Sequence, residues 1–411
     1  TIIPCSRCPS CGKHQYGQFE PRESRSFELA RPGGKYFNWH CEAEGMEICR
    51  FSQGYSEGST YEGYFALDNF WFESELNNDV FTGSLRHVFG CAEAETGEFT
   101  TQEADGIIGL GVRGDGRRPP SIVDVQVSEG RVREGGFSVC LGHDGGKVAL
   151  GGWNVPLHRG AKTWLDSTGL SWAEQYNVEV KGISLDGQPL HFDFEPVNAD
   201  GGQAFLDSGT TFVYFDRPLF AEWKKSFGEF CARDPRNCGG AKGYKECYRR
   251  DPKKFSSREA FLWSFPNATF WMQGGQAWPW FAQDFLVPAL DSPDLFCVGV
   301  KPLKNLVLGA VFMRNFDIFF DRQRKRVGFV RAKCGESDEP WVVEPHQTRL
   351  LPPSPLPQKQ EGFIFAIGVS SLVVVILLCG TVIIYIKRLR NKTNSSPEQR
   401  STPQPHSQQS I

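Results

Sequence analysis

The chain has 411 residues, of which 40% are hydrophobic and 23% charged, and its formal net charge is −3. This length allows two or more domains and excludes a disulfide-stabilised mini-protein. The composition, with 44 Gly and 26 Pro, is typical of a turn-rich globular protein and not of a coiled coil or a disordered chain. No basic face is implied, which argues against nucleic acid as a partner. Because residue 1 is Thr and not Met, we expect a processed form or a fragment.

A cysteine-rich segment at 5–49 comes first. Its Cys5, Cys8, Cys11 and His14 have a spacing that is compatible with zinc or with part of an iron–sulfur cluster. However, twelve cysteines precede residue 336, and an even number in an oxidising compartment favours six disulfides. We therefore predict disulfides and neither a metal nor another cofactor. Their connectivity stays open, because twelve cysteines allow ~10⁴ pairings.

The middle of the chain predicts a mostly β fold. From 60 to 335, short apolar runs are separated by Gly, Pro and Asp-Gly. In 176–190, alternating apolar residues run into Asp186-Gly187, a strong signal for a two-residue β-hairpin. Few segments are typical of helices, and the best is 217–230, which has a Pro just inside its start.

One motif has the residues that acid–base chemistry needs. It reads Ala-Phe-Leu-Asp-Ser-Gly-Thr-Thr, so an apolar strand runs into Asp207. The next residues, Ser208, Gly209 and Thr210, offer close backbone approach together with hydroxyl and amide donors for a carboxylate. Asp-Ser-Gly also occurs in ordinary turns, so this motif alone does not decide for catalysis.

An internal repeat flanks the motif. Ile-Ile-Gly at 107–109 and Val-Leu-Gly at 307–309 each place two bulky apolar residues directly before a Gly. One such triplet carries almost no information. The value of the pair comes from the Asp207 motif between them.

The C-terminal part predicts a membrane anchor. Residues 363–386 contain no charge, and at ~1.5 Å per residue they span a ~30 Å hydrocarbon core as one transmembrane helix. The basic residues that follow put the tail, 387–411, in the cytosol by the positive-inside rule. Residues 336–362 are then a Pro-containing stalk, and everything before the helix is lumenal or extracellular. Membrane lipid is the expected partner of 363–386.

Taken together, these motifs resemble the pepsin-like aspartic proteases. The matching elements are a flap-like segment with Tyr55, then 105–111, 205–211 and 306–330, in the family's order. The resemblance implies an all-β, bilobal fold, with an N-terminal lobe at 1–165 and a C-terminal lobe at 166–335. It also implies that Asp207 is the catalytic aspartate of the C-terminal lobe. Cys247 and Cys297 lie where the family has its usual second-lobe disulfide.

The chemistry of such enzymes needs a second carboxylate. Two close carboxyl groups share one proton, so that one activates water while the other polarises the scissile carbonyl; aspartic proteases are the standard example of this pair. The sequence has no Asp-Thr-Gly-Ser before Tyr55, and Asp166-Ser-Thr-Gly is read as a turn. We expect the partner aspartate upstream of Thr1, so that the chain alone is inactive. Dimerisation of single-aspartate chains is the less favoured explanation.

The cysteine-rich start and the flap resemble plasmepsin V and related apicomplexan enzymes, with a comparable insertion in plant nepenthesins. By that resemblance Glu57 pairs with a substrate arginine. This implies an endopeptidase of the endoplasmic reticulum or Golgi that processes secreted or exported polypeptides at an Arg-x-Leu type motif. The alternatives are a β-secretase-like sheddase of membrane proteins and a catalytically inactive lumenal receptor. The basic segment 231–251 is expected to be a solvated surface loop.

Overall fold

The computed structural model describes residues 1–33, 47–55, 58–71, 84–102, 104–111, 119–132, 135–143, 145–166, 175–195, 204–289, 292–335 and 343–345. These residues belong to one compact unit, Thr1–Gln347. Within the described ranges, none of the helices is long and apolar enough to span a bilayer. The expected anchor at 363–386 and the tail at 387–411 lie outside those ranges, so both stay predictions.

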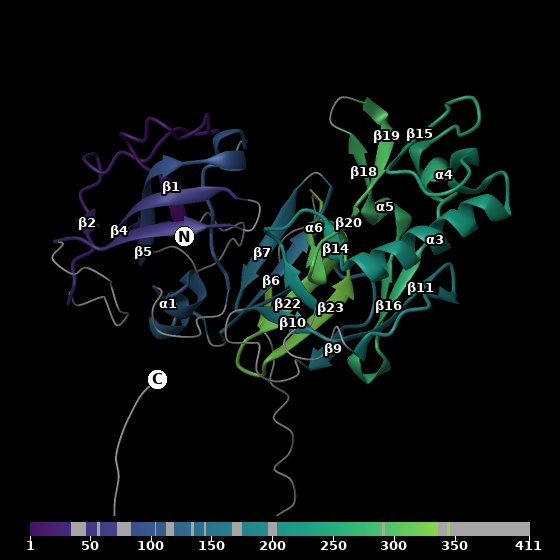
Figure 1. The fold of residues 1–411 in the computed structure, drawn as a ribbon. Coiled ribbons are helices and arrows are strands. Elements are labelled where there is room, and N and C mark those ends of the chain that lie inside the picture. The colour runs from purple at the N-terminus through teal and green to yellow at the C-terminus, as the bar shows by residue number, and fades with distance from the viewer. Residues whose placement is uncertain are drawn as a thin grey trace, which may run out of the picture. The chain divides into compact units, whose positions relative to one another are not determined.

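The first sheet is built from the N-terminal part of the chain (Figure 1). Its strand order is β1-β5-β4-β2, and β3 forms a hairpin with β4. The bounds are β1 Ile2–Pro4, β2 Glu28–Leu29, β3 Arg50–Gly54, β4 Thr60–Phe70 and β5 Leu85–Glu95. A short 3-10 helix, η1 (Gly97–Thr100), follows β5. Helix α1 (Ile122–Ser128) is preceded by the N-cap residue Ser121, which forms a reciprocal capping box with Asp124.

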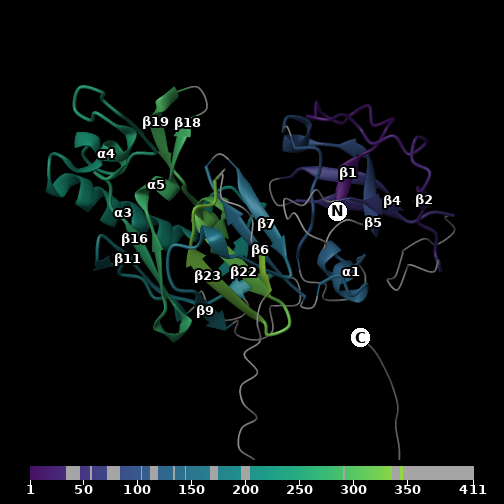
Figure 2. The same cartoon turned by 180° about the vertical axis from the view of Figure 1, so that it is seen from behind.

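A second five-stranded sheet joins the two halves of the sequence. Its order is β7-β6-β22-β23-β9, and Figure 2 shows blue β6 and β7 beside yellow-green β22 and β23. The bounds are β6 Gly136–Leu141, β7 Gly146–Leu150, β9 Thr163–Asp166, β22 Phe316–Asp321 and β23 Arg326–Arg331. A disulfide between Cys140 and Cys334 adds a covalent link. Nearby lie β8 (Gly152–Asn154), paired with β24 (Val343–Pro345), and η2 (Val155–Leu157).

Three further sheets form the C-terminal part, with orders β10-β13-β21-β14-β20, β12-β11-β16-β17 and β15-β19-β18. The bounds in the first are β10 Tyr176–Val178, β13 Ala204–Asp207, β14 Val213–Phe215, β20 Val300–Pro302 and β21 Val307–Gly309. Those in the second are β11 Val180–Leu185, β12 Gln188–Pro189, β16 Ala268–Met272 and β17 Ala277–Trp280. Those in the third are β15 Cys247–Arg249, β18 Leu286–Ala289 and β19 Ser292–Val298.

Six short or medium helical segments complete the described part of this region. They are α3 Arg217–Arg233, η4 Asn237–Gly240, α4 Arg258–Leu262, η5 Gln273–Gly275, α5 Ala282–Phe285 and α6 Ala310–Met313. The core between these elements is strongly aromatic. Trp278, for example, is fully buried and stacks on Phe329 with ring centroids 3.9 Å apart.

The mostly β prediction is confirmed, and so are its two sharpest local features. Asp186 and Gly187 both have positive φ, 49° and 75°, and they connect the paired strands β11 and β12. Helix α3 begins at Arg217 as predicted, and the side chain of Asp216 accepts a hydrogen bond from Leu219 N, 3.0 Å away. It ends at Arg233, three residues beyond the predicted end.

Candidate active site

Asp207 is the last residue of β13, and its carboxylate is held by its own loop. Oδ1 accepts a hydrogen bond from the backbone N–H of Gly209 at 3.0 Å, and Oδ2 accepts one from the hydroxyl of Thr210 at 2.6 Å. Asp207 is half-buried, whereas Ser208 is exposed. Both carboxylate oxygens therefore have a fixed direction, and the residues predicted from the motif at 204–211 do lie together.

The loop after Asp207 crosses one end of β21. Strand β13 pairs with β21 in parallel, and β14 pairs with the other edge of β21 antiparallel. Between them, the carbonyl oxygens of Thr210 and Thr211 accept hydrogen bonds from Ala310 N and Val311 N at 2.7 and 3.1 Å. The chain from β13 to β14 therefore wraps around one end of β21, and this fixes the position of Asp207.

Gly309 makes this crossing possible. A Cβ on Gly309 would lie 2.2 Å from the carbonyl oxygen of Phe212 and 2.5 Å from that of Thr210. These are backbone atoms of the same loop that positions Asp207, so they cannot turn away as a flexible side chain would. The Gly of the repeated triplet is therefore required by close approach.

Gly309→Ala should lower the free energy of unfolding by about 3 kcal/mol, the upper end of the usual cost of overpacking, because the added Cβ pushes against backbone atoms. Urea denaturation of the parent protein and of Gly309→Ala measures the difference in the free energy of unfolding. Gly160→Ala is the matched control, since nothing lies within 4 Å of a Cβ built there. Equal stability of the two variants would show that the Asp207 loop tolerates displacement.

The N-terminal sheet contains a partial counterpart of this arrangement. Ile2 exchanges two 2.8 Å backbone hydrogen bonds with Ile107, and β1 runs parallel to β5. In the C-terminal part, β14 likewise pairs antiparallel with β21 and parallel with β20. A Cβ on Gly106 would lie 2.3 Å from the carbonyl oxygen of Ile2. By this pairing, β1 corresponds to β14, and the segment at 107–109 corresponds to β21.

The N-terminal and C-terminal halves differ in what surrounds the second and third residues of the triplets at 107–109 and 307–309. Leu308 is fully buried, whereas the equivalent Ile108 is 53% exposed. Gly309 is crowded by the Asp207 loop, whereas no described atom lies within 4 Å of a Cβ built on Gly109. Among the described residues, the N-terminal half therefore has no counterpart of β13 and its aspartate-bearing loop.

Tyr55 directly follows β3, in the hairpin that the sequence predicts as a flap. Its backbone N–H donates to the carbonyl of Ser59 at 3.0 Å. Its ring packs edge-on against Phe99 at 4.9 Å, and Phe99 stacks on buried Tyr61 at 4.1 Å. The end of this hairpin that carries Tyr55 thus packs against η1. Glu57, the predicted arginine-binding residue, lies outside the described residues.

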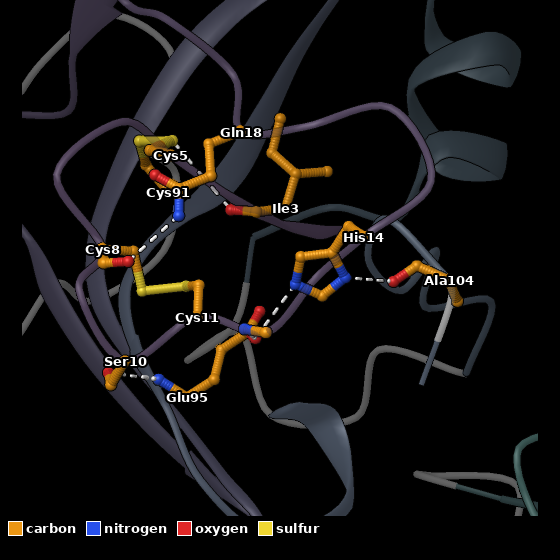
Figure 3. The surroundings of a disulfide bond; sticks show 11 residues. Ile3, Cys5, Cys8, Ser10, Cys11, His14, Gln18, Cys91, Glu95 and Ala104 are labelled. Atoms are coloured by element: carbon orange, nitrogen blue, oxygen red, sulfur yellow. Dashed lines mark hydrogen bonds and ion pairs between the residues drawn. A yellow bond between two sulfur atoms is a disulfide. The ribbon is translucent and has the colours of Figure 1, made fainter. Parts of the chain in front are cut away.

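The cysteine-rich segment is held by disulfides (Figure 3). Cys5 is bonded to Cys91 of β5, and Cys8 is bonded to Cys11. Within the described residues, no group of His, Cys, Asp and Glu has a metal-binding arrangement. Cys49 is also disulfide-bonded. The prediction of disulfides in this segment is therefore confirmed.

His14 anchors the same segment to the loop before Ile107. Figure 3 shows its ring between two acceptors: Nε2 lies 3.1 Å from Oε2 of Glu95, and Nδ1 lies 2.7 Å from the carbonyl oxygen of Ala104. The side chains of His14 and Glu95 are 1% and 0% exposed. Glu95 Oε2 also accepts from Gly12 N at 3.2 Å. Sequence reasoning singled out His14 only as a metal-ligand candidate and missed Glu95.

Glu95→Gln should lower the free energy of unfolding by about 2 kcal/mol, because the amide disturbs the buried hydrogen bonds that Glu95 makes with Gly12 N and with His14. Chemical denaturation measures the loss. Glu93→Gln is the control, since Glu93 pairs with Arg50 where both side chains are more than 40% exposed, and such pairs contribute at most about 1 kcal/mol. A similar small effect for both variants would contradict an anchoring role for Glu95.

The remaining predicted cysteines also form bonds. Cys247 of β15 is bonded to Cys297 of β19, and Cys231 of α3 is bonded to Cys238. The interpretation of 231–251 as a solvated loop is wrong in part. Cys238 and Tyr248 are 1% and 3% exposed, so burial and two disulfides fix this basic segment to the core.

Comparison with known protein families shows which family has this fold and this aspartate-containing loop. Residues 1–152 match the family profile described as xylanase inhibitor N-terminal, and residues 175–331 match the one described as xylanase inhibitor C-terminal. Both profiles describe halves of a pepsin-like aspartic protease fold. Because the two profiles together cover most of the sequence, the chain belongs to the pepsin-like aspartic protease family.

Three relatives illustrate the range within that family. Aspartyl protease family protein 1 of Arabidopsis thaliana is 27% identical over 63% of this chain and 47% of its own length. Aspartic protease 5 of Toxoplasma gondii is 24% identical over 81% of this chain and 33% of its own. Plasmepsin V of Plasmodium falciparum is 19% identical over 81% and 67%. This chain thus spans half or less of the first two relatives, and plant and apicomplexan relatives are similarly close.

Proposed function

We propose that the full-length protein is an aspartic endopeptidase in which Asp207 supplies one carboxylate of the catalytic pair. The observation that carries this is the loop that presents Asp207 with both oxygens oriented at the end of β13. An aspartate held in this way can take a proton from water while a partner carboxyl polarises the substrate carbonyl. The aspartic proteases among the relatives support the same chemistry.

The partner carboxylate is proposed to come from a strand upstream of Thr1 that pairs beside Ile108. The support is the correspondence between the two halves. A strand equivalent to β13 would cover exposed Ile108 and end next to Gly109, as β13 does beside Leu308 and Gly309.

The proposed substrates are polypeptides, and unfolded casein tests them. We expect the full-length protein to cleave casein and the 411-residue chain not to cleave it. Equal activity of both would contradict the proposed partner.

The substrate class is proposed to be secreted or exported polypeptides with an Arg-x-Leu type motif. The support is Glu57, placed by sequence two residues beyond flap Tyr55. A carboxylate beside the cleft can bind a guanidinium through two parallel hydrogen bonds, which favours arginine over other residues. A secretory location with a membrane anchor at 363–386 agrees with the disulfides, because such bonds persist in oxidising compartments.

Glu57→Gln should lower kcat/KM for an Arg-x-Leu peptide by roughly 10- to 100-fold, the loss expected for charge-assisted hydrogen bonds. The same variant should cleave a Gln-x-Leu peptide as fast as the parent. Glu62→Gln, an exposed carboxylate on the same hairpin, is the control. Unchanged selectivity in Glu57→Gln would favour the β-secretase-like alternative, which needs no arginine.

A non-catalytic binding role is the second candidate, and the observation behind it is that both family profiles are described as xylanase inhibitor domains. A full-length protein that binds a polypeptide tightly and never cleaves it would support this role. Sequencing the transcript upstream of Thr1 separates the candidates directly. An encoded Asp-Thr-Gly-Ser supports the enzyme, whereas its absence supports the binding protein.

A further inference from the structure

Asn267 begins an acceptor sequence for N-linked glycans. It is followed by Ala268 and Thr269, so the segment has the Asn-X-Thr pattern with no Pro in the middle. Asn267 is exposed and lies directly before β16, while Ala268 is 1% exposed inside the strand. The sequence pattern alone is common by chance, so the surroundings of Asn267 decide its meaning.

In the carboxamide of Asn267, the oxygen accepts a hydrogen bond and the nitrogen is available for modification. Oδ1 accepts a hydrogen bond from the backbone N–H of Ala282, the first residue of α5, at 3.0 Å. Among the described residues, Nδ2 of Asn267 donates no hydrogen bond. Glycosylation replaces one hydrogen of Nδ2 and leaves Oδ1 unchanged. The contact with α5 is therefore compatible with a modified Asn267.

A cavity of about 360 Å³ adjoins Asn267. Its other lining residues include Leu262, Trp263, Phe281 and Arg331. Trp263 is 80% exposed, which is unusual for a large aromatic side chain beside a cavity. A bulky partly apolar group attached at Asn267 would cover it.

On the polar side of the cavity, Arg331 is held by two neighbouring side chains. Arg331 donates to Oδ2 of fully buried Asp284 at 2.9 Å, and its guanidinium lies 4.7 Å from the ring centre of Phe281. It therefore keeps a fixed position with further N–H donors. Fixed donors next to an exposed indole suit a pyranose, which has hydroxyl acceptors around its rim and apolar C–H groups on its faces.

We propose that Asn267 carries an N-linked glycan whose first N-acetylglucosamine occupies this cavity, with one sugar face on Trp263 and its polar groups toward Arg331. The inference rests on the proposed lumenal location. In the transfer, Nδ2 of Asn267 forms a bond to C1 of a lipid-linked oligosaccharide. The C1–O bond to the lipid pyrophosphate breaks, the pyrophosphate leaves with the electron pair, and a base of the transferase takes the amide proton.

The first experiment measures occupancy in the full-length protein secreted by, or retained in, eukaryotic cells. N-glycanase should remove one glycan and convert Asn267 to Asp, seen by mass spectrometry of the peptide. Thr269→Ala should lose the glycan, whereas Thr269→Ser, which keeps the acceptor pattern, should retain it. Unmodified Asn267 in the parent protein would overturn the proposal.

A reporter separates this inference from the proposed location. Arg22 is exposed in a turn, and Arg22→Asn gives Asn-Glu-Ser there. Glycan at this reporter together with bare Asn267 would overturn the glycan inference and leave the lumenal location standing. A bare reporter together with bare Asn267 would overturn both.

The second experiment tests the cavity. Trp263→Ala should keep the glycan but release it several-fold faster when the native protein is treated with N-glycanase, because the first sugar loses its cover. Trp271→Ala is the matched control, since Trp271 is 45% exposed on β16 and does not line the cavity. Thermal unfolding checks that both variants are folded. Equal release rates for parent and Trp263→Ala would show that the sugar lies outside the cavity.

Discussion

Asp207→Asn in the full-length protein should reduce kcat for peptide-bond hydrolysis by at least ~10³-fold, the scale of general acid–base catalysis. The amide has the size of the carboxylate but cannot take a proton from water at neutral or acid pH. The loss should appear in kcat rather than in KM, because substrate contacts made by other residues are unchanged.

The loop around Asp207 makes this variant informative. An amide oxygen can still accept from Gly209 N, and the hydroxyl of Thr210 can turn to accept from the new amide, so both local hydrogen bonds survive. We therefore expect a folded, inactive protein with parental thermal stability. Asp186→Asn is the matched control, because Asp186 lies in an exposed hairpin turn. Activity in Asp207→Asn near the parental level would assign catalysis to another group.

Replacing both Cys140 and Cys334 by Ser should lower the free energy of unfolding by about 5 kcal/mol. The bond closes a loop with a sequence separation of 194 residues, and the entropy removed from the unfolded chain grows with loop length. Both cysteines are fully buried in a small cluster with Leu157 and Ala332. Denaturation by urea, with equal slopes for parent and variant, measures the loss.

The matched control is the double replacement of Cys8 and Cys11. Their separation is three residues, so the same relation gives about 2 kcal/mol. The difference between the two double variants tests the loop-length effect, since each removes one disulfide. Equal losses would mean that local packing around the sulfurs, and not the closed loop, carries the stability.

Local signals predicted local structure. Asp186-Gly187 fixes its hairpin because both residues adopt the positive φ that this turn requires. The Asp207 motif predicted its own hydrogen bonds for a similar reason, since Gly209 and Thr210 lie within three residues of the carboxylate. Such features depend on neighbours in the chain, which a sequence displays.

Long-range pairs could not be predicted in this way. His14 and Glu95 are 81 residues apart, and only the arrangement of β5 against the cysteine-rich segment brings them together. The partner of Cys5 is Cys91 for the same reason. Burial of Tyr248 in the basic segment 231–251 depends on the pairing of β15 with β19. In each case, the packing and strand register of the folded protein determine the contact, and the spacing of the residues in the sequence does not predict it.

The sheet shared by β6 and β22 has a consequence for how this protein can be divided. A cut between Asp166 and Tyr176 separates the sequence into two chains, but β6 stays hydrogen-bonded to β22 and β9 to β23. The Cys140–Cys334 bond crosses the same cut. The nicked protein therefore migrates as one species until a reductant and a denaturant are both present. The parts of the chain before and after this cut are therefore separate in sequence but fold as one unit.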